Sequence, residues 1–267
     1  MMMRLCAILL AVVTATSLTA ETVKLAVTTS FENSGLADVL LPHIERDTGL
    51  AVQLLVVGTG QAIRLGQAGD VDAIFVHARA AEEAFVADGF GTHRREIMYN
   101  DFVLVGPQND PAAIATATTA SEAFQAIAQA KAPFVSRGDE SGTHKAEQSQ
   151  WQSAGLEPAQ FSAWYREVGA GMGASLNTAA GLDAYILADR ASWLNFGNQA
   201  NLALLFSGDP ALFNQYAYLP VSADLHPHVN ASGAERLENW LTSNAARELI
   251  DGYRIAGEAL FVFNATP

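Results

Sequence analysis

Residues 22–35 read T-V-K-L-A-V-T-T-S-F-E-N-S-G, and residues 52–61 read V-Q-L-L-V-V-G-T-G-Q. Each stretch begins with β-branched and aliphatic residues, which are typical of a buried strand. Each then ends in glycine and small hydroxyl residues, which are typical of a loop. We expect strands at Thr22 to Val27 and at Val52 to Val57, so both strands run directly into polar loops.

Helical patterns follow these two loops. Leu36, Val39, Leu40 and Ile44 recur at helical spacing until Gly49 ends the helix. The next elements that we expect are a short helix at Ala62 to Ala68, a strand at Ala73 to Val76 and a helix at Ala80 to Ala87. This β-α-β-α-β order predicts a parallel sheet with right-handed crossovers.

A second α/β unit follows a strand at Asp101 to Val105 and a strong turn signal at Asn109-Asp110-Pro111. We expect a helix at Ser121 to Ala130, a strand at Pro133 to Ser136, a helix at Thr143 to Ala154, a helical region from the G-A-G-M-G-A loop at 169–174 to about Phe196, a strand at Tyr216 to Val221 and one long helix at Ser232 to Tyr253.

The order of elements predicts two lobes. If the chain crosses between them near 103 and again near 217, one lobe contains residues 21–103 and 217–267, and the other contains residues 104–216. Ligands of open α/β sheets bind beyond the carboxyl ends of the strands. The polar loops of the two lobes should therefore face each other across a cleft.

Composition indicates an exported globular protein. The chain has 267 residues, half of them hydrophobic, which is enough for about two domains. Residues 1–20 combine one cation, an apolar stretch from Leu5 to Val13 and small residues, so we expect a cleaved signal peptide. Cys6, the single cysteine, lies too early in this segment to carry a lipid anchor. We therefore expect a freely soluble periplasmic protein that does not insert into the membrane.

The formal net charge is −13 at pH 7, which argues against nucleic acid and anionic membranes as partners. An acidic protein can still bind an anion. The field of distant charges is screened over about 8 to 10 Å in salt, whereas a ligand in a closed cleft interacts with its nearest dipoles.

The stretch S-R-G-D-E-S-G-T-H at 136–144 has the residues of an anion-binding loop. Arg137 offers a rigid fork of N–H donors, and the hydroxyls of Ser141 and Thr143 add neutral donors. The following helix start supplies unpaired backbone N–H groups. The alternative is a surface arginine paired with Asp139 or Glu140.

Two upstream loops have similar chemistry. Thr28, Thr29 and Ser30 close the first strand, and Thr59 follows the second, next to Gly60. Any one of these loops is explained by ordinary helix capping. Their matching positions after strands favour a shared oxyanion site.

Other chemistries have weaker support. G-D-E-S-G at 138–142 lacks the spacing of a nucleophile elbow, although a secreted serine hydrolase that uses Ser141 and His144 remains an alternative. His226 and His228 lack a third ligand nearby, so we expect no metal site. Met172 is either a core residue or part of a cleft wall.

Several motifs resemble the family of tungstate-binding proteins that serve ABC importers. They are T-T-S at 28–30, V-G-T-G-Q-A at 57–62, V-H-A-R-A-A-E-E at 76–83, Y-N-D-F-V-L-V-G-P at 99–107, S-R-G-D-E-S-G-T-H-K at 136–145, G-M-G-A-S-L-N at 171–177 and H-P-H-V-N at 226–230. One departure is Val27, where the family's first loop usually has a further threonine. The resemblance covers essentially the whole mature chain.

The resemblance implies an α/β type II periplasmic binding protein fold, with two lobes that each have a mainly parallel sheet and are joined by two crossover strands. It also implies a carrier without enzymatic activity or cofactor, a tungstate ligand, a membrane permease as partner and a monomeric state. By motif match, the oxyanion contacts would be Thr29, Ser30, Thr59, Arg137, Ser141 and Thr143, with Thr28, Gly60, Gly142 and Gly173 as further candidates. Molybdate, sulfate and phosphate remain alternative ligands.

Overall fold

The computed structural model describes residues 21–139 and 141–266. The expected signal peptide, residues 1–20, lies outside the described residues. The first elements are β1 (Glu21–Thr28), α1 (Thr29–Asn33), α2 (Leu36–Thr48), β2 (Leu50–Val57), α3 (Thr59–Ala68), β3 (Ala73–Val76) and α4 (Arg79–Ala87). Strand β1 pairs in parallel with both β2 and β3, so the expected β-α-β-α-β unit is confirmed.

The middle of the chain forms a second set of strands and helices. They are β4 (Arg95–Pro107), η1 (Ile114–Thr116), α5 (Ala120–Ala130), β5 (Phe134–Ser136), α6 (Gly142–Ser153), η2 (Pro158–Gln160), β6 (Tyr165–Glu167), α7 (Met172–Leu182), β7 (Tyr185–Asp189), α8 (Arg190–Asn195) and β8 (Leu202–Phe206). Strand β5 pairs in parallel with β6 and β7.

The last part of the chain returns to the first set. Its elements are η3 (Pro210–Leu212), β9 (Phe213–Pro220), α9 (Ala231–Leu241), α10 (Asn244–Gly252), β10 (Arg254–Ile255), β11 (Glu258–Ala259) and β12 (Val262–Phe263). Strand β9 pairs antiparallel with β3 and β4, and β12 pairs antiparallel with β4. No helix of the described residues is long and apolar enough to span a bilayer.

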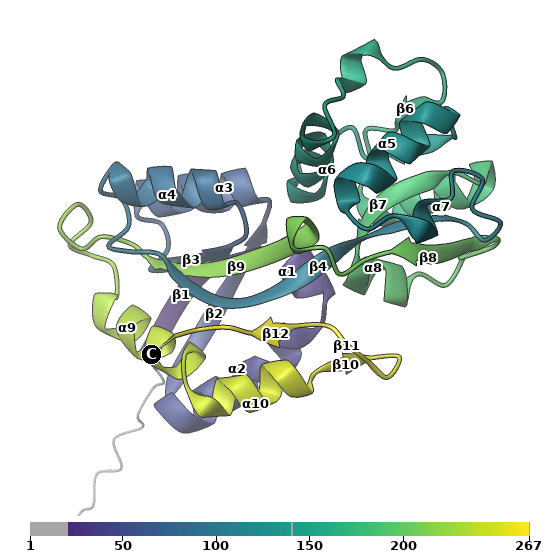
Figure 1. Cartoon of the computed structure of the whole chain (residues 1–267). Coiled ribbons are helices and arrows are strands. Elements are labelled where there is room, and N and C mark those ends of the chain that lie inside the picture. The colour runs from purple at the N-terminus through teal and green to yellow at the C-terminus, as the bar shows by residue number, and fades with distance from the viewer. Residues whose placement is uncertain (1–20, 140, 267) are drawn as a thin grey trace, which may run out of the picture.

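Strand β4 connects the two sets (Figure 1). The strand order is β2-β1-β3-β9-β4-β7-β5-β6, with β8 and β12 also paired to β4. Up to Asp101, β4 pairs with β9, and from Phe102 to Val105 it pairs with β7. A single strand therefore belongs to both halves of the sheet.

The hydrophobic residues form separate cores on the two sides of this change. Phe75 and Tyr216 belong to the core around β1, β3 and β9, whereas Phe134 and Trp151 belong to the core around β5 and α6. We call these two parts the first and second lobe. Their residue limits, 21–103 with 217–267 and 104–216, stay a prediction.

The long helix expected at 232–253 is wrong. Helix α9 ends at Leu241, and α10 begins at Asn244. The side chain of Ser243 caps α10 by accepting a hydrogen bond from the N–H of Ala246 at 3.3 Å. The apolar spacing continues through this break, so periodicity alone did not reveal it.

The region expected to be helical up to Phe196 contains strand β7. Its five residues, Tyr185 to Asp189, are all buried. A short run that is buried on both faces has neither helical nor alternating periodicity, which explains the error. Strand β9 also begins earlier than expected, at Phe213, because its first residues pair with β4 at Asp101.

Candidate functional site

The loop after β1 ends in a compact cluster of hydroxyl groups. Thr28 caps α1, and its Oγ1 accepts a hydrogen bond from the backbone N–H of Phe31 at 3.3 Å. Ser30 Oγ lies 3.0 Å from Thr28 Oγ1, 3.0 Å from His77 Nε2 and 3.2 Å from the Tyr216 hydroxyl. Residues from β1, from the end of β3 and from within β9 thus converge on one serine.

His77 and Tyr216 are both uncharged at neutral pH. Burial lowers the pKa of His77 to about 4, although its hydrogen bonds act in the opposite direction. Burial likewise raises the pKa of Tyr216 above its ordinary value. The two rings are in contact, with centroids 4.7 Å apart. The cluster therefore provides neutral hydrogen-bonding groups.

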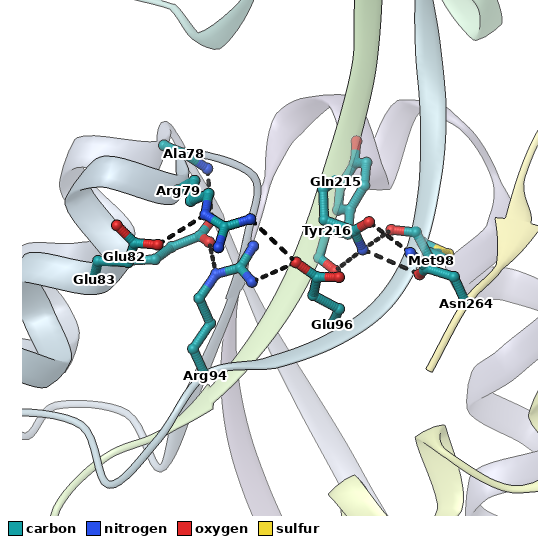
Figure 2. A network of polar contacts seen from close by, with 10 residues as sticks. All are labelled: Ala78, Arg79, Glu82, Glu83, Arg94, Glu96, Met98, Gln215, Tyr216 and Asn264. Carbon is teal, nitrogen blue, oxygen red and sulfur yellow. Dashed lines mark hydrogen bonds and ion pairs between the residues drawn. The ribbon is translucent and has the colours of Figure 1, made fainter. Parts of the chain in front are cut away.

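A buried ion pair holds the backbone that follows His77. Figure 2 shows Arg94 between Glu82 and Glu96, with Nε 2.7 Å from Glu82 Oε2 and NH1 2.7 Å from Glu96 Oε1. The other oxygen of Glu82 accepts the N–H of Ala78 at 2.5 Å. Glu82 is 0% exposed, so this pairing fixes the start of α4.

The loop after β5 forms a second polar cluster. Ser141 caps α6 by accepting the N–H of His144 at 3.2 Å. Asp139 accepts hydrogen bonds from Ser141 Oγ and from Arg137 NH2, each at 2.5 Å. Burial alone would raise the pKa of Asp139, but these hydrogen bonds and the charge of Arg137 hold the pKa below its ordinary value.

The Arg137 side chain is 17% exposed. Its Nε is buried and has no hydrogen-bond partner among the described residues. The carboxyl of Asp189, at the end of β7, is also buried. Burial raises the pKa of Asp189, and the nearby charge of Arg137 acts against this rise. Arg137 is therefore paired with Asp139 and still directs a donor into the interior.

The glycine-rich loop at 169–174 lies against the Arg137 loop. The N–H of Ala170 donates to the carbonyl of Arg137 at 3.1 Å, and the N–H of Val168 donates to the carbonyl of Ser136 at 3.1 Å. Met172 is 8% exposed and packs in the core of the second lobe. It is thus a core residue.

The two lobes approach each other at His77 and Gly142. A Cβ added to Gly142 would lie only 2.8 Å from Cε1 of His77 and 3.3 Å from Nδ1. Both residues line a cavity of about 500 Å³ whose wall also includes Lys145, Asn214 and Phe102. His77, which contacts Ser30 of the hydroxyl cluster, therefore lies against the first turn of α6.

The residues expected to contact an oxyanion fall into two polar clusters and a few positions outside them. Thr28 and Ser30 belong to one cluster, Arg137 and Ser141 to the other, and Gly142 lies between them. Thr143 is buried in the first turn of α6, whereas Thr29 and Gly173 are exposed. Thr59 and Gly60 begin α3, two to three residues beyond Val57, the residue of β2 that pairs with Thr28. These two residues share the sheet edge with Thr29.

Ser141 and His144 do not form the side-chain hydrogen bond that a serine hydrolase would need. Ser141 Oγ is hydrogen-bonded to Asp139, whereas Nδ1 of His144 lies 3.2 Å from Ser136 Oγ.

The Nε2–H groups of His226 and His228 donate to the backbone carbonyls of Gln67 and Gly69. Over residues 21–139 and 141–266, no cluster of three His, Cys, Asp or Glu side chains has the geometry for a metal ion.

Sequence reasoning missed three residues of this site: His77, Asn214 and Tyr216. His77 immediately follows β3 and is therefore at the same sheet edge as the loops after β1 and β2. The position of His77 directly after a predicted strand could therefore have indicated that it belongs to the site. Asn214 and Tyr216 lie within β9 and carried no such signal, because only the pairing of β9 with β3 and β4 brings them to the cleft.

The comparisons with known proteins agree with this architecture. Residues 13–245 match the family model described as PBP superfamily domain. Solute-binding proteins of this class carry small molecules between two lobes, so the chain is a carrier and not an enzyme. Those that serve ABC importers work outside the cytoplasm.

Three similar proteins narrow the family. The tungstate-binding protein TupA of Peptoclostridium acidaminophilum is 42% identical over 245 residues, which are 90% of this chain and 85% of that protein. The structure of the tungstate-binding protein TupA from Desulfovibrio alaskensis G20 is 41% identical, covers 92% of this chain and all of its own, and has a TM-score of 0.88. The structure described as the tungstate ABC transporter from Geobacter sulfurreducens is 47% identical, covers 87% of this chain and 99% of its own, and has a TM-score of 0.78. The chain belongs to the PBP superfamily and, within it, to the family of the TupA proteins.

Proposed function

We propose that this protein captures tungstate between its two lobes and delivers it to the membrane permease of an ABC importer. The observation that carries the proposal is the approach of the Ser30 cluster to the first turn of α6, marked by the His77–Gly142 contact. The family relationship supports tungstate as the ligand.

The chemistry of the two clusters suits a fully deprotonated tetrahedral dianion. Tungstate has only acceptor oxygens, so its site should provide donors. We propose Thr29, Ser30, Thr59, Arg137, Ser141 and Thr143 as the oxyanion contacts, with Thr28, Gly60, Gly142 and Gly173 as further contacts. The N-terminus of α6 adds backbone N–H groups and a favourable dipole to the side-chain donors.

Asp139 is compatible with a bound anion. Both of its oxygens already accept hydrogen bonds, one from Ser141 and one from Arg137. Its charge is therefore balanced within the loop, and its hydrogen bond fixes the position of the Arg137 guanidinium. An unbalanced carboxylate at this place would repel a dianion.

Molybdate, sulfate and phosphate are the competing ligands. Protonated phosphate would benefit from an acceptor, and the oxygens of Asp139 are engaged by internal donors. Sulfate is a pure acceptor but is smaller, so the size of the closed site must separate it. Molybdate has nearly the size and charge of tungstate, and only the relationship to the TupA proteins favours tungstate.

The proposed setting is the periplasm. Residues 1–20 would be removed as a signal peptide, and the mature chain would work as a monomer without a lipid anchor or a cofactor. Residues 21–103 with 217–267 and residues 104–216 would form the two lobes, which close on the ligand by rotation about the two connecting segments.

Titration calorimetry with tungstate, molybdate, sulfate and phosphate tests this function. Tight tungstate binding with weak sulfate binding is the expected result, and equally weak responses to all four anions would reject it. Ser141→Ala should weaken tungstate binding. Thr119→Ala removes the equivalent cap of α5 and should leave the affinity unchanged, which controls for the general loss of a helix cap.

A further inference from the structure

Three buried side-chain atoms of the described residues have no hydrogen-bond partner: Nδ1 of His77, NH2 of Arg94 and Nε of Arg137. Arg137 Nε belongs to the proposed oxyanion site, and Arg94 NH2 belongs to the ion pair of Figure 2. A buried polar atom without a partner costs about 1 to 3 kcal/mol. His77 Nδ1, which lies at the cleft, is therefore a candidate for contact with a ligand.

The position of the ring supports this assignment. His77 lines the cavity between the lobes together with Gly142 and Asn214. The Cε1–Nδ1 edge of the ring faces Gly142, the first residue of α6. Nδ1 is thus next to the helix start that supplies donors to the proposed anion.

The contacts of Ser30 allow a tautomer of His77 that has its proton on Nδ1. The Ser30 hydroxyl has a single proton and two acceptor lone pairs, and it has three polar neighbours. Thr28 and Tyr216 can each donate their own hydroxyl proton to Ser30. If Ser30 then donates its proton to His77 Nε2, the remaining ring proton is on Nδ1, and Ser30 contacts the anion through its backbone N–H at the start of α1.

The ring is also neutral, because burial lowers the pKa of His77 to about 4. A neutral imidazole has one donor and one acceptor. In the opposite tautomer, a lone pair on Nδ1 would face the dianion and repel it. The charge of the ligand therefore favours the proton position on Nδ1, which the contacts of Ser30 allow.

We propose that His77 is an additional oxyanion-binding residue, whose neutral Nδ1–H donates to the anion held between the lobes. This inference rests on the proposed function. It adds a donor from the end of β3 to the donors of the loops after β1, β2 and β5, and it makes the Ser30 hydroxyl the group that selects the tautomer.

Two substitutions separate the ring nitrogens. In His77→Asn the side-chain amide lies near the position of Nδ1, whereas in His77→Gln it lies near the position of Nε2. We expect His77→Gln to weaken the binding of the anion roughly tenfold or more, because it keeps the contact to Ser30 and loses the donor to the ligand. His77→Asn should weaken it by less than about threefold.

Calorimetry of the wild type and both variants uses whichever of the four anions the wild type binds most tightly. If the wild type does not prefer tungstate, tungstate is rejected as the ligand. The comparison of the His77 variants would still test whether His77 contacts the bound anion. Equal affinities of all three proteins, or a larger loss in His77→Asn than in His77→Gln, would overturn the inference, as would the absence of any anion binding. The same substitutions at His43 of α2, whose Nδ1 contacts the Val39 carbonyl, are the matched controls and should change the affinity less than twofold.

A second measurement does not depend on the folding of variants. Nitrogen-15 chemical shifts of the histidine rings distinguish a protonated Nδ1 from a protonated Nε2 in the wild-type protein. We expect His77 to be protonated at Nδ1 in the anion complex and neutral between pH 6 and 8. A complex in which Nε2 carries the proton, or in which the ring is charged, would contradict the proposal.

Discussion

Asp101 and Arg190 form a two-pronged ion pair at the point where β4 passes from one lobe to the other. Arg190 Nε lies 2.6 Å from Asp101 Oδ1, and NH2 lies 2.5 Å from Oδ2. Asp101 is the last residue of β4 that pairs with β9, and Arg190 is the first residue of α8. Only 13% of the Asp101 side chain and 17% of the Arg190 side chain are exposed. The pair therefore ties the second lobe to the connecting strand.

We expect Asp101→Asn to lower the free energy of unfolding by about 2 kcal/mol, because it removes the charge that accepts both hydrogen bonds. Urea unfolding measures the change. Glu258→Gln is the control: Glu258 lies 3.7 Å from Arg190 and is 60% exposed, so its loss should cost less than about 0.5 kcal/mol. A similar loss of unfolding free energy in the two variants would show that the two-pronged geometry of Asp101 and Arg190 adds no stability.

Gly142→Ala should weaken tungstate binding without unfolding the protein. The added Cβ would lie 2.8 Å from the His77 ring across the cleft, so it opposes the approach of the lobes. Alanine is itself acceptable in a helix. We expect at least a fivefold loss of affinity by calorimetry, and a change in the free energy of unfolding below about 1 kcal/mol.

The control for Gly142 is Gly181→Ala in α7, where an added Cβ would meet no atom within 4 Å. Its affinity for tungstate should equal that of the wild type. If Gly142→Ala also binds normally, the close approach to His77 plays no part in ligand capture.

Arg137→Ala should reduce the affinity for tungstate by roughly two to three decades, because it removes a guanidinium from a partly buried anion site and leaves Asp139 without its cationic partner. Part of this loss would come from repulsion between Asp139 and the ligand. We therefore expect the double variant Arg137→Ala/Asp139→Asn to regain about tenfold of the loss.

Asp139→Asn alone keeps an acceptor for Ser141 and removes one negative charge, so its affinity should fall by less than tenfold. Calorimetry of the four proteins completes the cycle. An Arg137→Ala affinity within threefold of the wild type would remove Arg137 from the site.

Two buried groups give the stability opposite dependences on pH. The pKa of His77 is lowered to about 4 by burial, so the unfolded chain takes up a proton first, and stability falls as the pH decreases from about 6.5 to 4. The pKa of Glu147 is raised to about 7 by burial, despite hydrogen bonds from Tyr165 and Trp151. Its contribution is present below about pH 4.5 and is lost as the pH rises to 7.

Each contribution is about 3 kcal/mol, and the two should largely cancel between pH 4.5 and 6.5. Urea unfolding of wild type, His77→Gln and Glu147→Gln at several pH values separates them. The difference between wild type and His77→Gln should increase with pH in this window, and the difference between wild type and Glu147→Gln should decrease. Differences that do not vary with pH would show that the two side chains are not the titrating groups.

Local sequence signals were sufficient for the elements that follow common rules. The strand at 73–76, the helix after the first loop and the helix expected at Thr143 to Ala154 were all indicated by residues within a few positions of one another. The signals failed at β7, where burial on both faces removes periodicity, and at Ser243, where a helix cap interrupts a continuing apolar pattern.

The sequence by itself determined the alternation of strands and helices, and it also placed hydroxyls, glycines and Arg137 directly after strands. Periodicity and turn chemistry act between near neighbours, so they can be read along the chain. Only the tertiary structure decided which groups meet these loops. Ser30 contacts a histidine 47 positions away and a tyrosine 186 positions away, and these contacts arise because β1, β3 and β9 lie side by side in one sheet.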